Sequence, residues 1–86
     1  MYYKTASSAV DAARENIEFR GYKVCEDDWR TQIAHGGRYN RLRPSTGKYH
    51  SFTISLFKND KPQRKCLHIT LYGMASGNFE LVSYLN

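Results

Sequence analysis

Two short runs near the C-terminal end of the chain alternate between apolar and polar residues. They cover residues 50–58 and 65–72. Period-two alternation is typical of strands that bury one side, and two such runs in succession predict an antiparallel hairpin. A slip of one residue would turn every apolar side chain to the wrong side, so the parity of the pairing is strongly constrained. With residues 60–63 as the loop, the predicted pairs are Phe52 with Leu71, Ile54 with Ile69 and Leu56 with Leu67.

The other side of this predicted hairpin is polar, with aromatic rings scattered through it. The same pairing sets Ser51, Thr53, Ser55 and Phe57 opposite Tyr72, Thr70, His68 and Cys66. Residues 73–78 are predicted to form a turn. The alternation of apolar and polar residues then resumes and continues to the end of the sequence. Keeping the apolar side continuous predicts Leu71 opposite Leu81 and Leu67 opposite Leu85.

The first part of the chain has the spacing of one amphipathic helix, over residues 5–21. Its apolar stripe consists of Ala6, Val10, Ala13 and Ile17, with Ala9 alongside. Thr5, Ser7 or Ser8 can cap the start, and Ser8 with Asp11 has capping-box spacing. Gly21 predicts the end, because glycine readily takes positive φ there. A stripe built largely of alanine lets the helix lie close to a sheet.

Residues 22–35 are harder to interpret. Tyr22 and Val24 predict a short strand. Trp29, Thr31 and Ile33 alternate with polar neighbours and favour a second strand. The alternative is a short helix capped by Asp28 and ending at residues 36–37, where two glycines stand.

These elements predict a single α+β domain over residues 1–86. An N-terminal helix packs on one face of a four- to five-stranded, mostly antiparallel sheet, in the order α-β-β-β-β and in two layers. A chain of this length buries only roughly 60 to 65% of its unfolded surface, so the core is small. One helix covers one face, which leaves the second face exposed or buried against another molecule.

The net charge of +5 is concentrated in the middle of the chain. Residues 29–66 hold nine Lys or Arg against one acid, whereas residues 1–28 hold four against six. Guanidinium groups bind phosphate, and interleaved tyrosines offer rings for base stacking. The candidate nucleic-acid or anion-binding residues are Arg38, Tyr39, Arg41, Arg43, Lys48 and Tyr49. The alternative for this stretch is a hydrated loop, and a second basic group, Lys58, Lys61, Arg64 and Lys65, fits a solvated hairpin tip.

The second face of the sheet is a candidate protein interface. Its residues are Phe57, His68, Tyr72, Val82 and Tyr84. Aromatic side chains supply contact area at little entropic cost, and a homodimer would enlarge the small core. We therefore expect self-association through this face or the strand edge beside Tyr84.

Catalytic and cofactor signatures are weak. A phosphate-binding loop over residues 42–49 would need glycine and a hydroxyl where Leu42 and Tyr49 stand. The predicted pairing places His68 across from Ser55 with Cys66 nearby, but no third group orients the imidazole. Four zinc ligands do not converge either. We therefore predict no catalytic residues, no metal and no cofactor.

The sequence favours a soluble cytoplasmic protein. It has no run of 18 apolar residues and no signal peptide, and two cysteines are too few for a disulfide framework. The predicted function is a small non-enzymatic module that binds nucleic acid or another anionic partner, such as an acidic protein surface, through the basic loop. The alternative is a protein-interaction module on the open sheet face, either a homodimer or an inhibitor or accessory protein of a mobile element. A small hydrolase is a distant third.

Overall fold

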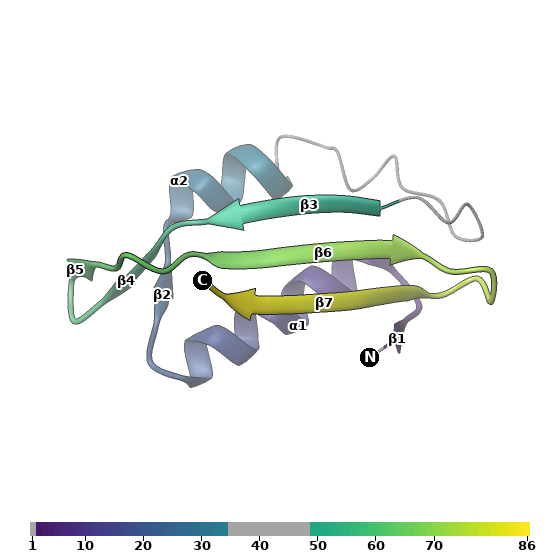
Figure 1. Cartoon of the computed structure of the whole chain (residues 1–86), viewed down its shortest axis with the longest axis horizontal. Helices are drawn as coiled ribbons and strands as arrows, with labels where there is room; N and C mark the ends of the chain where they lie inside the picture. The colour runs from purple at the N-terminus through teal and green to yellow at the C-terminus, as the bar shows by residue number, and fades with distance from the viewer. Residues whose placement is uncertain (1, 35–48) are drawn as a thin grey trace.

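A computed structural model describes residues 2–34 and 49–86, which form an α+β fold (Figure 1). Helix α1 (Ala6–Phe19) packs on a four-stranded antiparallel sheet. The strands of this sheet, in spatial order, are β1 (Tyr2–Tyr3), β7 (Phe79–Leu85), β6 (Leu67–Gly73) and β3 (Tyr49–Ile54). A second, smaller sheet contains β2 (Lys23–Val24), β4 (Leu56–Lys58) and β5 (Lys61–Pro62). Between β2 and β3, helix α2 (Glu26–Trp29) continues into a π-helical turn, η1 (Arg30–Ala34).

Of the three predicted caps for helix α1, Thr5 is the one used, and the helix ends before Gly21 as predicted. Thr5 is the N-cap, and its hydroxyl oxygen accepts a hydrogen bond from the main-chain N–H of Ser8 at 3.1 Å. Gly21 has φ 93°, the left-handed conformation that favours glycine after a helix. The buried side of the helix is the predicted apolar stripe. No helix in the described part of the chain is long and apolar enough to cross a membrane.

The predicted hairpin has the correct parity but the wrong register. Phe52 lies opposite Ile69 and Ile54 opposite Leu67, two residues from the predicted partners. The reason is that the first run is not one strand. It breaks at Ser55, and β4 then leaves the main sheet to pair with β2 and β5. The parity survives because a shift of two residues keeps every side chain on its side.

The turn after β4 is shorter than predicted. Lys58 pairs with Lys61, which leaves a two-residue loop of Asn59 and Asp60 instead of residues 60–63. Both loop residues have positive φ, 53° and 62°, as a type I′ turn requires. The pairing of β6 with β7 is as predicted, with Leu71 opposite Leu81 and Leu67 opposite Leu85.

The strand predicted at Trp29, Thr31 and Ile33 is wrong, because this segment is helical. A spacing of four residues between Trp29 and Ile33 fits a strand and a helix equally, and both side chains are buried. Thr31 decides the matter, since a strand would bury it with them and it is exposed. Asp28 does not cap the helix either. Its carboxylate accepts a hydrogen bond from the main-chain N–H of Ser55 at 2.9 Å.

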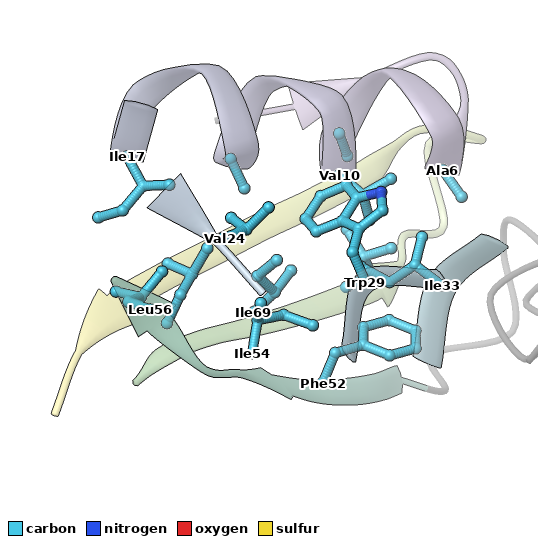
Figure 2. Packing of buried hydrophobic residues seen from close by; sticks show 14 of the residues in the cluster. Ala6, Val10, Ile17, Val24, Trp29, Ile33, Phe52, Ile54, Leu56 and Ile69 are labelled. Atoms are coloured by element: carbon cyan, nitrogen blue, oxygen red, sulfur yellow. The ribbon is translucent and has the colours of Figure 1, made fainter. Parts of the chain in front are cut away.

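One core joins the two helical segments and both sheets (Figure 2). Figure 2 shows Trp29 and Ile33 between α1 and Phe52, with Leu56 of the small sheet beside Val24. The buried hydrophobic residues are Ala6, Ala9, Val10, Ala13, Ile17, Val24, Trp29, Ile33, Phe52, Ile54, Leu56, Leu67, Ile69, Leu71 and Phe79. Arg14 covers one side of this core. Its guanidinium donates a hydrogen bond to the Glu26 carboxylate and lies 5.0 Å from the centre of the Trp29 ring.

Candidate binding face

The side of the four-stranded sheet away from α1 forms a flat surface, here called the open face. Alternate residues of β6, from Leu67 to Gly73, are buried on the α1 side, so the residues between them point to the open face. The strand registers arrange the open face in three cross-strand rows. The rows are Tyr49, Tyr72, Glu80 and Tyr2; then Ser51, Thr70 and Val82; then Thr53, His68 and Tyr84.

Aromatic rings occupy the first and third rows. The rings of Tyr49 and Tyr72 have centroids 5.6 Å apart and are tilted by 41°. The rings of His68 and Tyr84 are stacked, with centroids 5.0 Å apart and an angle of 20°. Tyr49 is 61% exposed and Tyr84 is 52% exposed, so each row presents a ring to solvent. Such rings suit either base stacking or protein association.

The middle row separates the aromatic rows with small polar groups. The hydroxyls of Ser51 and Thr70 are hydrogen-bonded at 3.2 Å, and Val82 completes the row. The only charged side chain in the three rows is Glu80. The three rows therefore consist mainly of aromatic and hydroxyl side chains. They contain no Lys or Arg, so a positively charged side chain that binds an anion beside this face must come from another part of the chain.

Two hydrogen bonds hold the imidazole ring of His68 in place. Its Nε2 lies 3.1 Å from the main-chain oxygen of Asn86, and its Nδ1 lies 3.3 Å from the hydroxyl of Thr53. A carbonyl oxygen only accepts, so Nε2–H is the donor to Asn86, and the Thr53 hydroxyl is the hydrogen-bond partner of Nδ1. Both ring nitrogens are therefore engaged, and the ring serves as a fixed stacking partner for Tyr84.

The structure brings together most of the predicted interface residues. His68, Tyr72, Val82 and Tyr84 share the open face. Phe57 does not lie on it, because Phe57 belongs to β4 in the smaller sheet and pairs with Pro62.

The predicted basic site lies mostly outside the described residues. Arg38, Tyr39, Arg41, Arg43 and Lys48 all fall in the range 35–48. Tyr49 is described, and it begins β3 on the open face instead of standing in a loop. The basic segment therefore leads directly, in sequence, into the first aromatic row.

One residue of the open face, Tyr2, was not predicted from the sequence. Tyr2 belongs to β1 and pairs with Glu80. Strand β1 has two residues, too few for a periodic signal, and only the tertiary pairing with β7 defines it. The adjacent tyrosines at positions 2 and 3 were the one compositional hint.

The second basic group surrounds the β4–β5 turn. Its four members, Lys58, Lys61, Arg64 and Lys65, are all exposed. The Lys58 ammonium lies 4.7 Å from the centre of the Tyr22 ring, a cation–π contact with the residue that follows α1. This contact gives Lys58 a structural role.

The catalytic pairing considered from the sequence does not occur. Thr53, not Ser55, lies opposite His68. The main chain of Ser55 instead bonds Asp28 and Cys25. Within residues 2–34 and 49–86, no three His, Cys, Asp or Glu side chains gather as a metal site would need. Comparisons with protein-family models, with curated proteins and with solved structures find no match for the chain.

Proposed function

We propose that the chain is a non-enzymatic module that binds single-stranded nucleic acid on the open face. The observation that carries the proposal is the pair of exposed aromatic rows, Tyr49 with Tyr72 and His68 with Tyr84. Successive bases of a single strand stack on such rings regardless of sequence. The rows are four residues apart along β6, about 13 Å at about 3.3 Å per residue. A single strand reaches across this distance, whereas a duplex buries its base faces.

The basic segment supplies the charge that the open face lacks. Arg38, Arg41, Arg43 and Lys48 precede Tyr49 directly in sequence. In this proposal they bind the phosphates while the rings hold the bases, and the net charge of +5 favours a polyanion. Hydroxyls of the middle row, Ser51 and Thr70, lie between the two ring positions and offer hydrogen bonds to base edges.

Fluorescence anisotropy with a labelled oligothymidine of about 12 nucleotides tests the proposal. The substitution Tyr49→Ser should weaken binding about five- to 150-fold, because loss of one stacking ring costs roughly 1–3 kcal/mol. Phe19→Ser is the matched control: Phe19 is an exposed aromatic residue on α1, on the other side of the sheet, and its loss should leave the affinity unchanged.

A charge variant separates phosphate contacts from stacking. Replacement of Arg38, Arg41 and Arg43 by alanine should reduce the slope of log affinity against log salt by about 0.7 per lost phosphate contact. Tyr49→Ser should leave that slope unchanged. Equal affinity for a duplex of the same length would contradict base stacking.

The same measurements distinguish the alternative function. If the oligonucleotide does not bind, and sedimentation shows a dimer that Tyr84→Lys converts to a monomer, then the open face is covered by a second copy and not by nucleic acid. Tyr84→Lys would act by placing an unpaired charge in the contact.

A further inference from the structure

A groove runs along the outer edge of β7, and it shares Glu80 and Val82 with the margin of the open face. Its volume is about 530 Å³, and it is lined by Tyr3, Ala12, Ala13, Asn16, Glu80, Leu81, Val82 and Ser83. One wall is α1 and the other is the strand edge. Figure 1 shows α1 behind β7 and extending past its edge, so the helix forms a shelf beside the strand.

The strand edge in this groove lacks a neighbour over its second half. Asn86 and Cys66 exchange both main-chain hydrogen bonds at 3.1 Å, and the antiparallel ladder alternates from there. The N–H and C=O groups of Ser83 and Leu85 therefore point away from β6. Strand β1 pairs only with Phe79 and Glu80, and no other described strand lies alongside β7 on that side.

This edge lacks two of the usual protections against strand addition, charged residues and proline. Residues 81–85 contain no charge and no proline. The opposite edge of the sheet differs, because there the side chain of Gln32 occupies the main-chain groups of Thr53. The edge of β3 is therefore bonded by a side chain at Thr53, whereas the edge of β7 borders the groove.

Helix α1 also carries an exposed apolar side chain beyond the residues that line the groove. Phe19 is 93% exposed and lies one turn beyond Asn16 on the same face of α1 as Ala12. The small side chains of Ala12 and Asn16 leave room for a chain to pass, and Phe19 offers a ring to cover it.

The charged residue that lines the groove is acidic. It is Glu80, whose side chain points to the open-face side of β7, away from α1. The ion pairs among the described residues involve Arg14 and Arg30 with other carboxylates, so the Glu80 carboxylate is left for an external cation.

We propose that the groove binds an extended, basic polypeptide segment of another protein, which adds to the sheet beside β7. Its main chain bonds Ser83 and Leu85, its apolar side chains face Ala12 and Phe19 on the α1 side, and the lysines or arginines that alternate with them face Glu80 on the other side of the sheet. This is strand addition to an exposed sheet edge. A second copy fits less well, because two β7 edges related by a two-fold axis would place both α1 shelves on the same side, projecting toward each other (Figure 1).

The probe is an acetylated, amidated eight-residue peptide of alternating valine and lysine, carrying a fluorophore. It should bind, and addition of the peptide should slow exchange of the Ser83 and Leu85 amides, while the β6-bonded amides of Val82 and Tyr84 change little. The matching peptide of valine and glutamate should bind at least tenfold more weakly. A valine–lysine peptide N-methylated at alternate residues should also lose binding, because it cannot complete the ladder.

Ser83→Pro tests the edge from the protein side. Proline is tolerated where the lost N–H does not serve the sheet, so the fold should persist while binding falls at least tenfold. Ser83→Ala is the control and should bind as the wild type does, and Phe19→Ser should weaken binding severalfold. Equal binding of the N-methylated peptide would overturn the proposal, even if Ser83→Pro failed to fold. So would a dimer that Ser83→Pro converts to a monomer.

Discussion

The side-chain amide of Gln32 pairs with the main chain of Thr53 as a neighbouring strand would. Its Nε2 donates to the Thr53 oxygen at 2.6 Å, and its Oε1 accepts from the Thr53 N–H at 3.2 Å. One side chain from η1 thus bonds the outward-facing main-chain groups of Thr53 and ties the helical segment to the sheet.

Gln32→Ala should lower the free energy of unfolding by about 1–2 kcal/mol, because two hydrogen bonds are lost at a partly exposed site. Denaturant unfolding measures this, and amide exchange at Thr53 should accelerate in parallel. The neighbour Thr31→Ala is the control, since Thr31 is exposed. A stability equal to that of wild type would mean that water replaces the amide without cost.

Asp60→Gly should raise the stability of the chain by up to about 1 kcal/mol. Asp60 has φ 62°, a conformation that costs an L-residue roughly 1–2 kcal/mol and glycine almost nothing. Asn-Gly is also the preferred sequence of a type I′ turn. Asp60→Ala removes the carboxylate but keeps the strain, so thermal unfolding should show no gain for it.

Thr5→Ala should cost about 1 kcal/mol, since it removes the side-chain acceptor of the Ser8 N–H at the start of α1. Ser7→Ala should be close to neutral because the N-cap is Thr5. Far-ultraviolet circular dichroism during urea unfolding compares the two. A larger loss of stability for Ser7→Ala than for Thr5→Ala would contradict the assignment of Thr5 as the N-cap.

Arg14→Met should lower stability by about 1 kcal/mol, a modest amount because the ion pairs with Glu18 and Glu26 are partly exposed. Burial lowers the pKa of Arg14, but the carboxylates of Glu26 and Glu18 outweigh it, and the net pKa is raised. A cation whose folded pKa is raised contributes fully below its unfolded pKa and loses that contribution only as the pH rises through the folded value.

The loss in Arg14→Met should therefore stay constant from about pH 6 to about pH 9. Urea midpoints at several pH values check this. A loss that vanished above neutral pH would show that a different group titrates at the contact.

Much of the fold was predictable because its signals are local. The helix cap, the glycine stop and the alternation of β6 and β7 each depend on a few neighbouring residues, and the structure confirms them. The register of β3 was not predictable in the same way. It depends on the break at Ser55, which is produced by contacts with Asp28 and Cys25, about 27 residues or more away in sequence.

The predictions for the candidate site show the same difference between local patterns and long-range contacts. Alternation alone placed Tyr72, Val82, His68 and Tyr84 on one face, because they lie on β6 and β7, whose register was predicted correctly. Tyr2 joined that face only through long-range pairing with Glu80. The helix at residues 26–34 was mistaken for a strand because Trp29 and Ile33 are four residues apart, a spacing that both periods satisfy.

The pairing of β1 with β7 also bears on how the chain folds during synthesis. Tyr2 pairs with Glu80, which lies far away in the sequence, so a nascent chain holds β1 unpaired until β7 has left the ribosome. Contacts of such long sequence separation form late and slow the final step of folding. Helix α1 and the β6–β7 hairpin are built from local contacts, and we expect them to form first, with β1 docking last.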